Sequence, residues 1–154
     1  MLMRVFLICA IGDVPSPRTI LFAMSHVGFA LNVWAFGTLI RCRPPLGRDG
    51  SVLYPSGLWE RQVIRLVQVM VVLNVFDLAC TLFHYHQGNL WELNPLALTL
   101  LTHAPSVVVF KLSLTIGAAI IFLVARSCRL AQVGSWWVVV AYTILILRWN
   151  SHYC

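Results

Sequence analysis

The chain alternates between long apolar runs and shorter segments rich in polar, Gly and Pro residues. The apolar runs occupy residues 19–40, 62–86, 105–126 and 135–153. An α-helix needs about 20 apolar residues to cross the hydrocarbon core of a bilayer. The pattern therefore predicts an all-α fold, a polytopic membrane helical bundle of about four transmembrane helices.

The segments between the runs predict how the helices are connected. Residues 41–61 contain many Pro and Gly residues and predict a loop. Residues 90–104 form an apolar stretch that is too short to cross a bilayer. We expect this stretch to be a short re-entrant or interfacial helix between the second and third spans.

The N-terminal segment, residues 1–18, joins a basic residue to a short apolar stretch and two prolines. It resembles a weak signal peptide or an interfacial stretch, and whether residues 1–12 are removed stays open. We divide the remainder into the first span with its basic loop, residues 19–61, and a three-helix membrane core, residues 62–154.

Composition supports a membrane protein and argues against a nucleic-acid partner. Of the 154 residues, 60% are hydrophobic and only 10% are charged. A soluble domain carries about 25% charged residues, so the lipid bilayer is the expected solvent. The net charge of +6 comes mainly from Arg residues between the apolar runs. We expect no nucleic acid, because no basic face with interleaved aromatic residues is present.

The same arginines predict the orientation of the bundle. Loops 41–61 and 126–134 contain Arg residues, whereas the connection at 87–104 contains neither Lys nor Arg. Basic loops face the cytoplasm in most membrane proteins. We therefore expect both basic loops in the cytoplasm and both termini outside, in a bacterial inner (cytoplasmic) membrane.

A polar cluster interrupts the second span. Asn74, Asp77, Thr81 and His84 follow one another at spacings that place them on one helix face. Lys111 lies near the start of the next span, on the side of the membrane where the second span ends. The depths of Lys111 and Asp77 in the membrane differ by about one helical turn. A charge near the bilayer centre costs about 2.5–3.5 kcal/mol, so we expect the two to pair. The pair is either a clamp between helices or a proton or cation relay.

Further candidate residues lie near the end of the second span. Glu92, Asn94 and Pro95 predict a turn in which Asn94 caps the helix that Pro95 begins. Glu92 also has the chemistry to hold an ion. We expect no metal site, because His84, Glu92 and His103, the nearest candidates, lack the spacing of a metal motif.

His26 is the candidate for binding a cofactor. It lies in the middle of the first span, with Ala23, Ser25 and Gly28 close by. Small neighbours leave room for a haem or a chlorophyll-type pigment with an axial imidazole. The alternative is a histidine that bonds to a neighbouring helix. The five Cys residues form no CxxC motif and predict neither a disulfide framework nor a zinc site.

The order of these motifs resembles a known family. Residues from about 65 to 152 are similar to a bacterial family of small integral membrane proteins, the domain-of-unknown-function family numbered 5658. Its pattern is matched here by Asn74, Asp77 and Thr81 in one helix, by Glu92, Asn94 and Pro95 after it, and by Lys111 in the next helix. The resemblance implies a three-helix membrane core and supplies no activity.

Two classes of function remain open. The first is a non-catalytic accessory or scaffold subunit, which would pack on other membrane-protein subunits, whereas a homo-oligomer would favour the second. The second is a small ion, proton or solute transporter subunit that uses Asp77 and Lys111. A weaker alternative is a membrane-embedded enzyme, with a Ser–Lys pair at Lys111 and with Ser106 or Ser113 as the nucleophile. No nucleophile motif is present, so we expect no catalytic residue.

Overall fold

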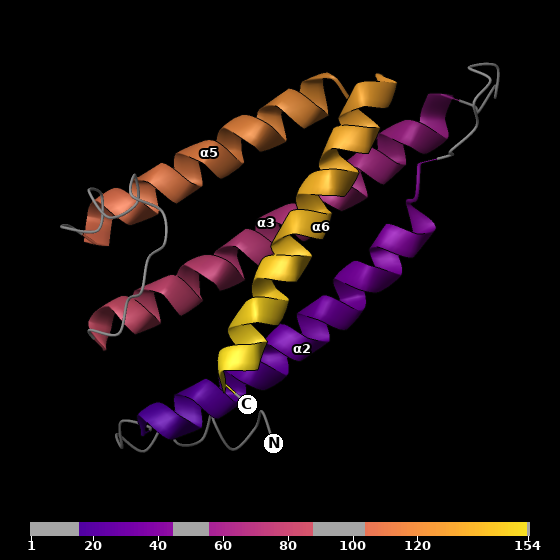
Figure 1. Ribbon diagram of the computed structural model, residues 1–154. Helices are drawn as coiled ribbons and strands as arrows, with labels where there is room; N and C mark the ends of the chain where they lie inside the picture. Colours follow the sequence, from indigo (N-terminus) through magenta and orange to yellow (C-terminus); the bar gives the residue numbers. More distant parts are fainter. Residues whose placement is uncertain (1–15, 45–55, 88–103, 154) are drawn as a thin grey trace, which may run out of the picture.

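The computed structural model describes residues 16–44, 56–87 and 104–153, and all further structural statements refer to these residues. They form α-helices with no strand (Figure 1). The helices are α2 (Pro17–Arg41), α3 (Ser56–His86), α5 (Ala104–Val124) and α6 (Arg129–Tyr153). The expected all-α bundle is confirmed.

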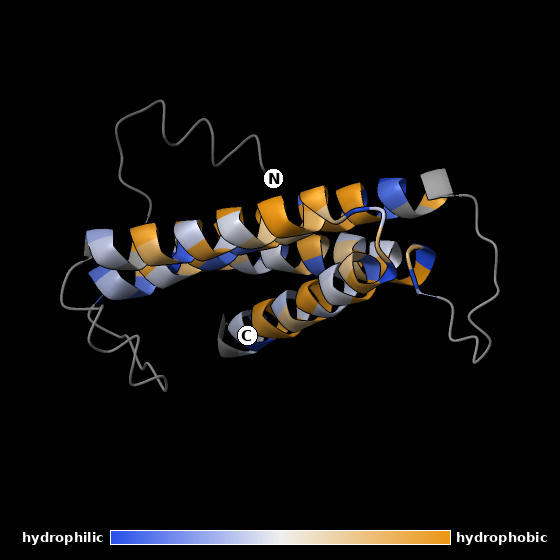
Figure 2. Ribbon diagram, turned by 90° about the horizontal axis from the view of Figure 1, so that it is seen from above, coloured by the Kyte–Doolittle hydropathy of each residue, from blue (hydrophilic) through white to orange (hydrophobic). Residues whose placement is uncertain are grey.

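Three of these helices have stretches long and apolar enough to cross a membrane. These stretches are Pro17–Arg41, Glu60–His86 and Arg129–Ser151. The fourth helix, α5, has 21 residues and contains a shorter apolar stretch at Val108–Val124. Figure 2 shows hydrophobic residues along much of the length of the helices. The fold is therefore that of an integral membrane protein.

Local chemistry explains where α2 begins and ends. The Ser16 side chain accepts a hydrogen bond from the Thr19 backbone N–H at 3.3 Å, and Pro17 follows it in the first turn. This is a favoured N-terminal arrangement, because Pro lacks the N–H that a first turn leaves unpaired. At the other end, the Cys42 N–H donates to the Thr38 carbonyl at 2.8 Å.

Two helices begin earlier than the apolar pattern predicts. The structure starts α3 at Ser56 and α6 at Arg129, whereas the apolar runs start at 62 and 135. Hydrophobicity marks only the part of a helix that contacts lipid. Residues such as Glu60 and Gln132 also favour helix, so each helix continues past the apolar run toward water.

α3 is the central helix of the bundle. α6 packs against α3 and α2, and α5 packs mainly on α3. The described residues of α2 and α5 make no contact with each other. Half of the α3 span is buried, compared with 17% of the α2 span. The largest fully buried side chains include Leu66, Met70 and Leu73 of α3 and Ile146 of α6.

Figure 1 shows that the end of α2, the start of α3, the end of α5 and the start of α6 lie at one end of the bundle. The two predicted basic loops adjoin this end. The short segment expected at 90–104 falls on residues outside the described ones, apart from the first residue of α5. The predicted N-terminal segment at 1–18 also lies largely outside them.

Candidate functional site: an intramembrane ion pair

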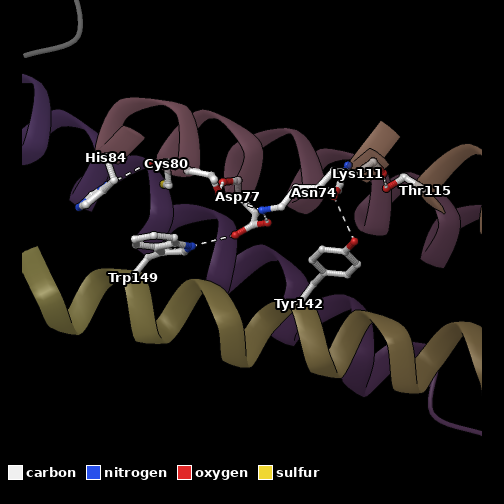
Figure 3. A network of polar contacts seen from close by, with 9 residues as sticks. Asn74, Asp77, Cys80, His84, Lys111, Thr115, Tyr142 and Trp149 are labelled. Atoms are coloured by element: carbon white, nitrogen blue, oxygen red, sulfur yellow. Dashed lines mark hydrogen bonds and ion pairs between the residues drawn. The ribbon is translucent and has the colours of Figure 1, made fainter. Parts of the chain in front are cut away.

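The centre of the polar cluster is an ion pair between α3 and α5. The Lys111 ammonium donates to Asp77 Oδ2 at 2.6 Å and to Thr81 Oγ1 at 2.8 Å (Figure 3). The Asp77 side chain is only 4% exposed, whereas that of Lys111 is 27% exposed. Asp77 and Thr81 are four residues apart on a helix, so a single ammonium group reaches both.

A third helix contributes to the same carboxylate. The Trp149 indole N–H of α6 donates to Asp77 Oδ1 at 2.8 Å. The Thr81 hydroxyl donates to the Asp77 backbone carbonyl at 2.8 Å, which leaves its oxygen lone pairs directed at Lys111. Both carboxylate oxygens are therefore engaged, and the buried charge joins α3, α5 and α6.

A second polar contact lies beside the ion pair. The Tyr142 hydroxyl donates to Asn74 Oδ1 at 3.1 Å, which links α6 to α3 again. The Asn74 side-chain nitrogen is buried and has no hydrogen-bond partner among the described residues. The Thr115 hydroxyl donates to the Lys111 backbone carbonyl at 2.9 Å. Asn74 thus bonds to α6 and not to the ion pair.

His84, the fourth residue on the predicted face, lies next to Trp149. Its Nδ1 bonds to the Cys80 carbonyl at 2.9 Å. A carbonyl only accepts, so Nδ1 carries the proton. The imidazole and indole ring centroids are 4.9 Å apart. His84 therefore packs against the ring that bonds Asp77.

The metal candidates are only partly described. Among the described residues, no group of three or more His, Cys, Asp and Glu side chains is placed to hold a metal ion. Glu92, Asn94, Pro95 and His103 lie outside the described residues, so the predicted turn and its ion-holding role stay predictions.

His26 is exposed on α2. Its Nδ1 bonds to the Phe22 carbonyl at 2.8 Å, and the two rings are 4.2 Å apart. Because the carbonyl accepts, the proton is on Nδ1 and Nε2 is left as the acceptor. A metal-ligating histidine has the same arrangement. Haem or pigment binding at His26 stays a prediction, and any such group would approach from outside the bundle.

Two residues of the site were missed by sequence reasoning. Trp149 and Tyr142 both lie in the apolar run 135–153, and neither was singled out as a site residue. Both come from α6, whose rotation relative to α3 is not encoded in any local motif. A signal was nevertheless present, because a Trp inside an apolar run has an N–H that needs a partner when it is buried.

The geometry suits a clamp between helices better than a relay that transfers a proton or a cation. Lys111 and Trp149 each donate to one oxygen of the Asp77 carboxylate. Thr81 accepts a hydrogen bond from Lys111 and donates one to the Asp77 backbone carbonyl. Of the residues named for Ser–Lys chemistry, Ser113 is exposed and Ser106 is half-buried, and the Lys111 ammonium bonds to Asp77 and Thr81.

The comparison with family models identifies the wider class. The chain matches the model described as Domain of unknown function (DUF5658) over residues 68–153, which is more than half of its 154 residues. The chain belongs to this family. The matched part contains Asp77, Thr81, Lys111 and Trp149, and it excludes α2. Neither a curated protein nor a solved structure matches the chain significantly.

Proposed function

We propose that this chain is a non-catalytic accessory or scaffold subunit of a larger membrane complex. The observation that carries the proposal is the Asp77 carboxylate, because the chain's own side chains engage both of its oxygens. A buried carboxylate that accepts charge-assisted and indole hydrogen bonds from two neighbouring helices holds those helices together. The buried charge therefore serves to hold three helices together, which leaves the outer helix faces for partner subunits.

The outer faces have the composition for such contacts. Large apolar side chains are exposed on α2 and α5, among them Phe29 and Phe36 of α2 and Val109 and Ile116 of α5. Gly37 and Gly117 lie on the same helices, and in the described part of the chain no neighbouring atom lies within 4 Å of where a Cβ would be. Small residues on a transmembrane helix allow another helix to approach closely.

Purification from native membranes in mild detergent tests this proposal. We expect the chain to elute with larger subunits, which mass spectrometry would identify. Replacing Gly37 and Gly117 by Leu leaves the ion pair intact and should release the partners if these faces carry them. A lone chain or a simple homo-oligomer, at native expression level, would contradict the accessory role.

A second function, proton or ion transport, has one observation in its favour. The Lys111 side chain is 27% exposed while its partner Asp77 is 4% exposed, so the cationic end of the pair reaches the outside of the helix pair. Flux into liposomes with an imposed potential tests this function. Transport that is lost in Asp77→Asn, with the helical content unchanged, would establish it in place of the scaffold role.

We also propose that the end with the basic loops faces the cytoplasm, in the inner membrane of a bacterium. Helical spans support an inner membrane, because outer-membrane proteins are mostly β-barrels. Cys128 is exposed in the turn between α5 and α6. Its labelling therefore shows which side of the membrane this end faces. A membrane-impermeant maleimide should label Cys128 in inverted vesicles and not in intact cells.

Cys42 supplies an internal control at the same end. It is buried, and burial raises the pKa of its thiol, although Arg65 and Arg41 oppose the shift. The thiolate is the reactive form, so Cys42 should stay unlabelled at neutral pH on either side. The experiment uses a variant in which Cys9 and Cys154 are replaced by Ser. Labelling of Cys128 in intact cells would show that this end faces outside and that the proposed orientation is wrong.

A further inference from the structure

One end of the bundle carries a group of exposed arginines that neither the ion pair nor the proposed scaffold role uses. We call it the basic end, and it consists of Arg41, Arg43, Arg61, Arg65, Arg126 and Arg129. Among the described residues, Glu60 is the one acidic side chain there. The Arg126 Nε atom lies 3.5 Å from Glu60 Oε2, with both side chains at least 37% exposed. One half-exposed carboxylate does not neutralise six guanidinium groups.

The arginines lie at two depths. Arg41 and Arg65 belong to the inner tier, because Arg41 ends α2 and Arg65 lies about one turn further into α3 than Arg61. Arg61 and Arg129 belong to the outer tier. Arg61 precedes Gln62, which bonds to Gln132 of α6, and Arg129 starts that helix. At about 1.5 Å per residue, Arg61 lies roughly 6 Å further out than Arg65.

Tryptophans mark where the membrane surface lies at this end. The Trp136 indole N–H donates to the Leu39 carbonyl in the last turn of α2 at 3.0 Å. The ring of Trp137 is 5.2 Å from that of Trp136 and is 60% exposed. Indole rings gather at the headgroup level of a bilayer. Arg41 is two residues beyond Leu39, so the inner tier lies about 3 Å outside the indole level.

We propose that the basic end binds the phosphate groups of anionic phospholipids, which lie between the inner and outer tiers of arginine. The headgroup region is about 5–8 Å deep on each side of a bilayer, which matches the separation of the tiers. Guanidinium groups bond phosphate oxygens in a bidentate manner. Charge complementarity favours a phosphate, and the position of the tiers at headgroup depth favours a lipid phosphate over a soluble one.

Lipid titration of the detergent-purified full chain tests this proposal by native mass spectrometry. The probes are phosphatidylglycerol, phosphatidylcholine and inorganic phosphate. We expect phosphatidylglycerol to bind at concentrations at which phosphatidylcholine does not bind. Millimolar inorganic phosphate should not displace the bound phosphatidylglycerol. A juxtamembrane cation contributes about fivefold in affinity for an anionic surface. Arg61→Gln with Arg129→Gln should thus weaken phosphatidylglycerol binding at least tenfold.

A matched control removes two charges at the opposite end. Arg18 and Arg148 are exposed there, and Arg18→Gln with Arg148→Gln should leave binding within about twofold. Arg61→Lys with Arg129→Lys keeps the charge and the helices, so it should retain most of the binding even if the Gln pair fails to fold. Equal loss in the two Gln pairs, equal binding of both lipids, or displacement by inorganic phosphate would each overturn the proposal.

Discussion

The family core and α2 are attached to the bundle by different means. In the core of α3, α5 and α6, Asp77 is buried, with 3% of the whole residue exposed, and its charge is paired. On α2, the buried Asn32 is 6% exposed, and neither of its amide atoms has a partner among the described residues. The core is therefore joined by directed polar bonds, whereas α2 is joined mostly by shape.

Shape complementarity is visible along the inner face of α2. Its buried residues are Gly28, Asn32, Ala35 and Leu39, which repeat with the spacing of a left-handed helix pair. The polar link nearest the end of α2 is the Trp136 indole, which bonds to a carbonyl in the last turn. Such terminal carbonyls lack a partner within their own helix. The comparison predicts that charge changes disturb the core, and that size changes disturb α2.

The largest expected effect comes from breaking the ion pair. Asp77→Ala leaves Lys111 without its counter-ion and Trp149 without its acceptor. Removing one partner of a buried pair costs about 3–5 kcal/mol. We expect a corresponding loss in the free energy of unfolding, measured by denaturant titration of the purified chain in detergent, together with low expression.

Replacing both partners separates lost charge from lost packing. Asp77→Leu with Lys111→Met should recover most of the stability, because a well-packed apolar pair often matches a buried ion pair. Exchanging the two charges should recover less, since the Trp149 N–H would then face an ammonium group. If the single and double variants unfolded alike, the pairing would not be what stabilises the core.

The next effect concerns the size of a residue on α2. A Cβ at Gly28 would lie 3.1 Å from the Phe76 ring and against the Asn150 side chain. Overpacking costs about 1–3 kcal/mol, so Gly28→Leu should lower the thermal midpoint of unfolding. Gly37→Leu is the matched control, because no neighbouring atom of the residues described by the structure lies within 4 Å of a Cβ there. Equal shifts for the two variants would show that α2 is not held by close packing.

The two indole hydrogen bonds allow a direct comparison of the regions. Trp149→Phe leaves a buried carboxylate oxygen unpaired, at a cost of about 1–3 kcal/mol. Trp136→Phe removes a bond to a helix-terminal carbonyl near the membrane surface, where water replaces it at about 0.5–1 kcal/mol. Unfolding in detergent should therefore rank Trp149→Phe as the more damaging change, and the reverse order would contradict the division between core and α2.

The sequence predicts part of this arrangement for identifiable reasons. Helical periodicity and rise place Asp77, Thr81 and Lys111 near one another, because these depend only on local geometry. The contribution of Trp149 depends on how α6 is rotated against α3, which no local pattern states. The early starts of α3 and α6 were also missed, since an apolar run marks contact with lipid and not the end of a helix.

The smallest effect is expected at His26, and it tests the outward face of α2. His26 and His84 make the same local bond, from Nδ1 to the carbonyl four residues earlier. They differ in surroundings, because His26 is exposed and His84 packs 4.9 Å from the Trp149 ring. His26→Ala should change stability by less than about 0.5 kcal/mol, and His84→Ala by more.

The same two variants separate a cofactor ligand from a packing residue. If His26 binds haem or pigment, the protein purified from native membranes will show visible absorbance that disappears in His26→Ala and persists in His84→Ala. Loss of a bound cofactor also lowers stability through mass action, so His26→Ala would then become the more damaging change. If the protein is colourless and His84→Ala is the less stable of the two variants, then α2 is held by shape. The His26 imidazole then faces lipid or a partner subunit.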